Sequence, residues 1–134
     1  MNIQLIELNK ISENNGVLTI TEENTTNCPF KISRVFHVHA NTGSQRGKHA
    51  HKECSQLLIC NNGKVEVECN NGIEVKTYIL DSLNYGLLIQ PMIWSTQNYL
   101  IDNTILTVIC SHLYKEEDYI RDYSEYLNII KKNK

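Results

Sequence analysis

Two Asn-Asn-Gly triplets, at residues 61–63 and 70–72, limit the possible folds of this chain more than any other feature. Asn and Gly tolerate the positive φ angles that tight hairpin turns require. Short apolar or alternating segments flank both triplets, and alternation with a period of two is typical of a half-buried β-strand. Two such turns about nine residues apart predict an antiparallel β-meander rather than a parallel sheet.

The rest of the chain is expected to form further short strands and one helix. In residues 115–132 the apolar side chains follow helical spacing, and acidic residues at the start and lysines at the end suit the helix dipole. The segment 104–110 is almost continuously apolar and should be buried on both faces. The prediction is a single all-β domain over residues 1–134, a small antiparallel β-barrel or jelly roll with a C-terminal helix. Strands are expected at 3–8, 17–21, 30–39, 49–60, 64–69, 73–80, 86–90 and 104–110.

Composition and charge disfavour several classes of protein. Lys and Arg number 13 and Asp and Glu 15, so the net charge of -2 gives no electrostatic reason to expect nucleic acid or an anionic membrane as partner. No apolar run approaches the ~20 residues that a membrane-spanning helix needs, and the start lacks the basic segment of a signal peptide. An odd number of cysteines without a Cys-x-x-Cys pair predicts reduced, packed thiols in a cytoplasmic protein. These cysteines are Cys28, Cys54, Cys60, Cys69 and Cys110.

The segment 43–63, GSQRGKHAHKECSQLLICNNG, carries the residues that indicate chemistry. His49 and His51 are one residue apart at the start of a predicted strand, so both imidazoles should point to the same face. Arg46 lies just upstream, in a loop that contains two glycines. A charged, flexible loop followed by paired histidines places acid/base groups at the mouth of a β-structure.

The spacing within this segment resembles the first motif of the cupin family, with Gly43, five residues, His-Ala-His, four residues, Gln56, six residues and Gly63. The resemblance implies a jelly roll whose interior holds the site. Metal-binding cupins have a glutamate at the position of Gln56 and a further histidine near Pro91, about where this chain has Ser95. Because two of the four usual ligands are missing, we expect no metal and no other cofactor, and we interpret the histidines as free acid/base groups.

Other segments carry a narrower resemblance over nearly the whole chain. Several segments, taken in their order along the chain, closely resemble the nucleotide-sugar 3,4-ketoisomerases of the WxcM-like type. Those cupins act on dTDP-4-keto-6-deoxyglucose in bacterial surface-glycan pathways. The segments are Ile32-Ser-Arg-Val-Phe, Arg46-Gly-Lys-His-Ala-His-Lys, Gln56-Leu-Leu-Ile-Cys, Pro91-x-x-Trp94 and Glu117-Asp-Tyr-Ile-Arg-Asp-Tyr.

The resemblance implies a tautomerisation that moves the carbonyl from C4 to C3 of the hexose through an enediol. His51 is the expected base for the carbon-bound proton and His49 its partner at the sugar oxygens, although the sequence does not decide this division. Arg46 is a candidate clamp for a diphosphate or an oxyanion, because its planar guanidinium matches both. Further contacts with the dTDP-sugar are expected from Arg34, Lys48, Gln56 and Trp94.

Several of these residues also have a purely structural interpretation. Gln56 reaches the face of the two histidines only if a bulge intervenes, and Trp94 is equally suited to the core. Arg46 could be a solvated loop residue. Tyr119 and Tyr123 are expected to pack along the C-terminal helix.

The chain departs from the family pattern at a few positions. The strand around residues 34–39 usually carries adjacent tyrosines, one of them near the substrate, whereas this chain has Phe36 and His37. His37 is therefore a candidate catalytic residue in place of a tyrosine. Relatives also tend to have an arginine where this chain has Asn15 and a histidine where it has Ser95. These departures leave the configuration at C4 of the product, gluco or galacto, undecided.

Other functions remain compatible with the sequence. A nucleotide-sugar 3,5-epimerase has the same jelly roll and substrate but depends on a different arrangement of residues. A non-catalytic sugar-binding cupin would explain His37 and Ser95, and a metal dioxygenase is disfavoured by the missing ligands. The amphipathic edge strand at 3–8 favours pairing across a two-fold axis, and the resemblance implies a homodimer with exchanged N-terminal strands.

Overall fold

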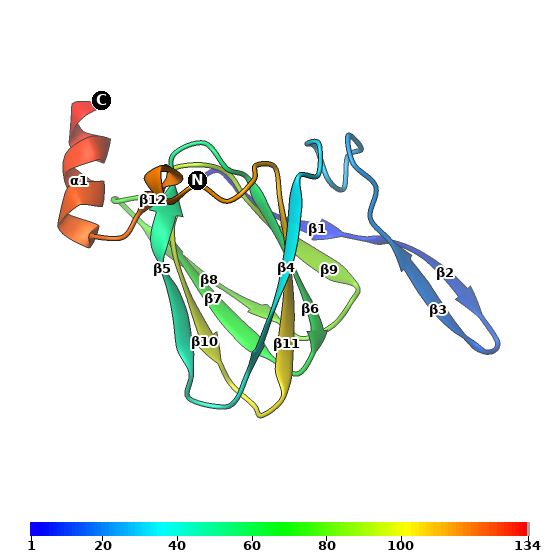
Figure 1. Cartoon of the computed structure of the whole chain (residues 1–134). Helices are drawn as coiled ribbons and strands as arrows, with labels where there is room; N and C mark the ends of the chain where they lie inside the picture. The colour runs from blue at the N-terminus through cyan, green and yellow to red at the C-terminus, as the bar shows by residue number, and fades with distance from the viewer. Residues whose placement is uncertain (134) are drawn as a thin grey trace.

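Two five-stranded antiparallel sheets form the body of the computed structural model, which describes residues 1–133 (Figure 1). The predicted all-β, cupin-like barrel with a C-terminal helix is confirmed. The first sheet has the order β1 (Ile3–Glu7), β9 (Tyr85–Ile89), β6 (Gln56–Asn62), β11 (Thr104–Cys110) and β4 (Arg34–Ala40). The second has the order β12 (Tyr119–Ile120), β5 (Gln45–His51), β10 (Trp94–Tyr99), β7 (Val65–Asn70) and β8 (Val75–Leu80).

The main hydrophobic core lies between these two sheets. Along β7 the alternate residues Val65, Val67 and Cys69 are fully buried, while the residues between them are more exposed, as expected for a strand with one face on the core. β11 lies in the middle of its sheet between β6 and β4, and six of its seven residues are buried. Its predicted burial on both faces is therefore confirmed.

The two Asn-Asn-Gly triplets make different connections between strands. Residues 70–72 connect β7 to β8, which pair as the predicted hairpin. Residues 61–63 connect β6 to β7, which lie in different sheets, so the predicted three-stranded meander is wrong at this turn. Gly63 has a φ of +86°, and an added Cβ there would lie 2.7 Å from the Cα of Thr104. The chain therefore turns tightly against the start of β11 and crosses from one sheet to the other.

Some strands differ from those predicted. The expected continuous strand at 49–60 is two strands, β5 and β6, in separate sheets. β10 was not expected, because its buried residues Ser95, Thr96 and Gln97 are polar and do not produce an apolar pattern. β2 (Asn9–Glu13) was also missed, and it pairs with β3 (Gly16–Ile20) in a hairpin that projects from the barrel (Figure 1).

The C-terminal helix α1 spans Tyr123–Lys132 and is shorter than the predicted 115–132. It begins late because the Asp122 side chain caps it, accepting a hydrogen bond from the backbone N–H of Glu125, and because the preceding residues pair with β5 instead. Tyr126 is fully buried and donates hydrogen bonds to the backbone carbonyls of Asn70 and Met92, which fixes α1 to the second sheet. Within residues 1–133, no helix has the length and apolar character needed to span a bilayer.

Candidate active site

A β-bulge in β5 aims the functional side chains into the barrel. Two consecutive residues of β10 lie opposite Gly47 and His49, which leaves Lys48 as the extra residue. Both Gly47 and Lys48 have positive φ angles, +82° and +60°. Because the bulge interrupts the alternation of the strand, Arg46 and His49 line one pocket although they are three residues apart. Lys48 is exposed and is not among the lining residues, so the structure does not support its predicted contact with substrate.

The pocket has a volume of about 180 Å³ and is lined by five strands and the segment that follows β12. It brings together three residues that the sequence singled out, Arg46, His49 and Gln56. Gln56 is the first residue of β6, in the opposite sheet, and it is only 6% exposed. Its amide nitrogen lies 3.6 Å from the sulfur of Cys110. The remaining lining residues are Phe36, Val38, Gly47, Gln97, Tyr119 and Arg121.

His49 and His51 lie side by side, as the sequence predicts for alternate residues of a strand. Their ring centroids are 5.1 Å apart with nearly perpendicular planes. Nδ1 of His49 and Nε2 of His51 are buried and have no hydrogen-bond partner among the described residues. Buried polar atoms are nearly always paired in proteins, so two free imidazole nitrogens next to a pocket indicate a place for an incoming ligand.

The environment of His49 keeps its imidazole neutral. Burial, as the largest effect, and the neighbouring charge of His51 lower the pKa of His49 to about 4, against a smaller opposing effect of the Gly47 backbone. A neutral imidazole has one N–H donor and one lone pair. At physiological pH His49 can therefore donate a hydrogen bond to a developing oxyanion and accept a proton from a hydroxyl.

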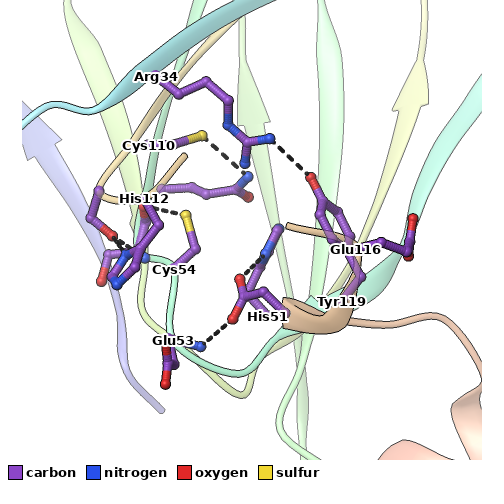
Figure 2. Close-up of polar contacts among 12 residues, drawn as sticks. Arg34, His51, Glu53, Cys54, Cys110, His112, Glu116 and Tyr119 are labelled. Carbon is purple, nitrogen blue, oxygen red and sulfur yellow. Dashed lines mark hydrogen bonds and ion pairs between the residues drawn. The ribbon is translucent and has the colours of Figure 1, made fainter. Parts of the chain in front are cut away.

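Asp118 is a site residue that the sequence analysis missed. Its Oδ2 accepts a hydrogen bond from Nδ1 of His51 at 2.8 Å, and its Oδ1 accepts one from the backbone N–H of Glu53 at 2.7 Å (Figure 2). Burial raises the pKa of Asp118, but the hydrogen bonds from His51 and from the amides of Glu53 and Cys54 outweigh it and hold the pKa below its usual value. Because an ionised carboxylate only accepts, the proton of neutral His51 is on Nδ1 and the lone pair is on Nε2.

Tyr119 was expected to pack along a helix, but it belongs to β12 and faces the two histidines. Its ring centroid is 4.3 Å from that of His51 and 5.0 Å from that of His49. Arg34 donates to the Tyr119 hydroxyl at 3.4 Å (Figure 2). The guanidinium of Arg121 lies 4.3 Å from the Tyr119 ring centroid. Arg34 therefore contacts the pocket through Tyr119, and is not itself among the lining residues. No helical or strand periodicity in the sequence pointed to this arrangement.

Two predicted site residues lie elsewhere. His37 is exposed on the face of β4 opposite to Phe36, and its Nδ1 is 2.9 Å from the hydroxyl of Thr107. This placement does not agree with the predicted catalytic role of His37, since it is Phe36 that reaches the pocket. Trp94 points to the helix side of β10, where it packs against Tyr123 at 5.2 Å, so it does not line the pocket either.

The barrel interior does not provide the usual metal ligands of a cupin. The amide of Gln56 lines the same pocket as His49, and Ser95 of β10 is paired with His49 of β5. An amide and a hydroxyl are poor substitutes for a carboxylate and an imidazole around a transition metal. The donor set therefore suits proton transfer by the imidazoles themselves better than a resident metal.

Comparison with known proteins gives the family. A family model described as "FdtA: WxcM-like, C-terminal" matches residues 1–131. The chain belongs to this family. It is 35% identical over 133 residues to the TDP-4-oxo-6-deoxy-alpha-D-glucose-3,4-oxoisomerase of Aneurinibacillus thermoaerophilus, with 98% of this chain and 95% of the relative covered. The expected class of enzyme, an isomerase, is confirmed by this match and by the solved structures.

Two solved ketoisomerases of known fold are similar over almost the whole chain. The sugar 3,4-ketoisomerase QdtA of Thermoanaerobacterium thermosaccharolyticum, in complex with TDP, has a TM-score of 0.93 and 34% identity, covering 98% of this chain and 96% of QdtA. A histidine-to-asparagine variant of QdtA has been solved with TDP-4-keto-6-deoxyglucose. WlaRA of Campylobacter jejuni, a TDP-fucose-3,4-ketoisomerase, has a TM-score of 0.90 and 30% identity, covering 96% of both chains.

Replacing Asp118 by Asn tests how this WxcM-like protein orients His51. The amide can still accept the backbone hydrogen bond from Glu53, but its NH₂ group would face Nδ1 and favour the tautomer with the proton on Nε2. We expect kcat to fall roughly 10²-fold, with a shifted pH profile and little change in KM. Glu117→Gln, which neutralises an exposed carboxylate next to it, should retain wild-type kcat. An Asp118→Asn enzyme with wild-type kcat and pH profile would contradict the role of Asp118.

The low pKa of His49 makes stability depend on pH. An unfolded histidine has a pKa of about 6.5, whereas folded His49 has a pKa of about 4. Between these values the unfolded chain binds more protons at this residue, so its contribution to the free energy of unfolding falls as the pH drops from about 6.5 to about 4. Urea unfolding over this range should show a smaller loss of stability in His49→Gln than in the wild type. Parallel pH dependences would refute the assignment.

Proposed function

We propose that this protein is a sugar 3,4-ketoisomerase that converts TDP-4-keto-6-deoxyglucose to a TDP-linked 3-keto-6-deoxyhexose. The observation that carries the proposal is the free Nε2 of His51, oriented by Asp118 and packed against two residues that line the pocket, His49 and Tyr119. The name of the Aneurinibacillus relative supports the reaction. The QdtA variant that holds TDP-4-keto-6-deoxyglucose supports the substrate.

The reaction needs a base for the proton on C3, which is acidic because it is next to the C4 ketone. Nε2 of His51 takes this proton while the C3–H electron pair forms the C3=C4 double bond and the C4 carbonyl becomes an enediol oxygen. The C4 oxygen takes a proton from the N–H of His49, which completes the enediol. In the second half, the C3 hydroxyl returns a proton to His49 and becomes the new carbonyl, while the imidazolium of His51 gives its proton to C4. Asp118 stabilises the imidazolium that forms at His51 between the two halves.

His49 is suited to the protons on oxygen. Because it is neutral, its N–H can donate to the oxyanion that develops at C4, and its lone pair can accept the proton from the C3 hydroxyl. The hydroxyl of Tyr119 and the amides of Gln56 and Gln97 are further polar groups of the pocket wall. We assign them to holding the sugar oxygens, and we assign no step to a metal or a cofactor.

The size and charge of the pocket fit the sugar end of a nucleotide sugar. Ligand pockets are usually about 300–1,000 Å³, so about 180 Å³ takes only part of such a substrate. Arg46 and Arg121 both line the pocket. The exposed guanidinium of Arg46 can pair with the diphosphate in two-point hydrogen bonds. Arg121 already donates from Nε and Nη2 to the carboxylate of Glu116, so it adds positive charge near the diphosphate rather than a second two-point pairing. The nucleoside then lies outside the part of the pocket that holds the histidines.

We place the reaction in the cytoplasm, in the biosynthesis of 3-amino-3,6-dideoxyhexoses for bacterial surface glycans. Five free and buried cysteines agree with a reducing compartment. A ketone at C3 is the functional group that an aminotransferase converts to an amine, so an enzyme of that class would consume the product.

The test of this function is proton NMR of TDP-4-keto-6-deoxyglucose incubated with the protein in deuterium oxide. We expect a 3-keto sugar that carries deuterium at C4, whose coupling constants also give the C4 configuration. In His51→Gln this product should be absent, because the variant has no group to take the C3 proton. His37→Gln is the matched control and should keep the activity, since His37 is on the outer face of β4.

Other outcomes of this experiment decide between the alternatives. Exchange at C3 and C5 without a 3-keto product would favour a 3,5-epimerase. Exchange no faster than in His51→Gln would contradict catalysis and favour a sugar-binding cupin.

We also propose that the protein is a homodimer in which the N-terminal strands are exchanged. Within residues 1–133 the β2–β3 hairpin pairs with no other strand, and a two-stranded hairpin is at best marginally stable alone in water. It also exposes large apolar side chains, with Ile11 and Leu18 on paired positions at 49% and 60% exposure. A second copy of the chain would cover this hairpin.

The double substitution Ile11→Lys with Leu18→Lys should convert the dimer to a monomer, because two charges would have to be buried in the interface. Sedimentation velocity over a range of protein concentrations measures this change. Val75→Lys, at an apolar side chain of β8 that is 55% exposed, is the control and should remain dimeric. A wild-type protein that sediments as a monomer would disprove the proposal.

A further inference from the structure

We propose that His51, Cys54 and Asp118 form an inhibitory site for a thiophilic divalent cation such as Zn²⁺. One possible ligand atom from each of these residues lies within 4.8 Å of the other two. The cluster differs from the metal set of the cupins, because Cys54 and Asp118 are not at cupin ligand positions. None of its three residues lines the pocket in which the sugar is proposed to react, but His51 packs against His49 and Tyr119, which do.

The donor atoms match the chemistry of zinc. An imidazole nitrogen, a thiolate sulfur and a carboxylate oxygen are its three common protein ligands, and three such ligands leave a fourth position for water. With Zn–S near 2.3 Å and Zn–N or Zn–O near 2.0–2.1 Å, ligand atoms of a tetrahedral site lie roughly 3.3–3.6 Å apart. The widest of these separations must therefore contract by up to about 1.5 Å, which side-chain rotation can provide.

The backbone around the cluster is already held in place. Lys52 donates its backbone N–H to the carbonyl of Asp118 at 2.9 Å, and Glu53 donates its own to the Asp118 carboxylate at 2.7 Å. These bonds join the end of β5 to the turn before β12 (Figure 2). Since Cys54 follows directly in the chain, all three ligands come from two segments that are fixed to each other.

The second indication is that His51 keeps one ring nitrogen free to coordinate. His51 is only 6% exposed, and its Nε2 has no partner among the described residues. Cys54 is 2% exposed, so the site is shielded from competing water ligands. Asp118 also lines a separate surface cavity of about 290 Å³, whose other lining residues are Glu53, Glu117, Lys52 and Lys115. Its three acidic side chains outnumber its two lysines, so a cation can approach Asp118 from this side.

A metal bound here would stop His51 from transferring protons. Coordination at Nε2 occupies its lone pair, and coordination at Nδ1 displaces the hydrogen bond to Asp118. The inhibition thus rests on the function proposed above, whereas the binding of the metal does not. On binding, the thiol proton of Cys54 is released to solvent and replaced by the metal–sulfur bond.

Metal binding is tested directly on the whole protein after treatment with a chelator and desalting. In titrations against a chromophoric chelator we expect one Zn²⁺ per chain, and Co²⁺ should produce a thiolate-to-cobalt charge-transfer band in the near ultraviolet. Cys54→Ser should lose the band and weaken Zn²⁺ binding at least ~10-fold. Cys60→Ser, at a buried thiol outside the cluster, is the matched control and should bind as the wild type does.

Inhibition is measured separately in the isomerase assay with buffered free Zn²⁺. Wild type and Cys60→Ser should be inhibited and recover with EDTA, while Cys54→Ser should be active and at least ~10-fold less sensitive. A wild-type protein without the cobalt band, or a Cys54→Ser protein that binds Zn²⁺ as tightly as wild type, would overturn the site. If Cys54→Ser does not fold, the existence of the site is decided in the same way by Zn²⁺ binding to Cys54→Ala and by the cobalt spectrum of the wild type. The binding results stand even if the isomerase assay shows no activity.

Discussion

The active site depends on a pairing of only two residues, β12 with the end of β5. Tyr119 lies opposite His51 and Ile120 opposite Ala50 in this short ladder. It places the tail of the chain against the histidine strand and brings the carboxylate of Asp118 to Nδ1 of His51 at 2.8 Å. Without this pairing His51 would lose its orientation, and the pocket would lose the wall that Tyr119 provides.

The pocket treats its two histidines differently, although they are separated by one residue. His51 has a carboxylate on one nitrogen, which fixes the tautomer and can stabilise a positive charge on the ring. His49 has no acidic hydrogen-bond partner in the described residues, and burial keeps it neutral. One strand thus presents a base that can carry a charge next to a group that stays neutral. The proposed division of carbon-bound and oxygen-bound protons follows from this difference.

The errors of the sequence analysis have identifiable physical causes. β10 was missed because its inward residues are polar, and strand prediction depends on apolar alternation. Residues 115–122 resemble the start of a helix in charge and spacing, but Glu116–Asp118 form only one short 3₁₀ turn. The pairing of Tyr119–Ile120 with β5 outweighs the local preference for a longer helix. His37 and Trp94 were assigned to the site from the resemblance alone, while the alternation of their strands directs them to the outer face and to α1.

The sequence by itself determined the class of fold, the family and the central pair of histidines. Period-two alternation, turn residues and a specific motif are local properties, and local properties can be read from a single chain. Only the tertiary structure decided that Asp118, Tyr119 and Gln97 join the site. These residues are 46 to 70 positions away from His49 or His51 along the chain, and Gln97 lies on a strand without an apolar pattern. Contacts between such distant segments depend on how the sheets close around the core, and no local periodicity encodes that closure.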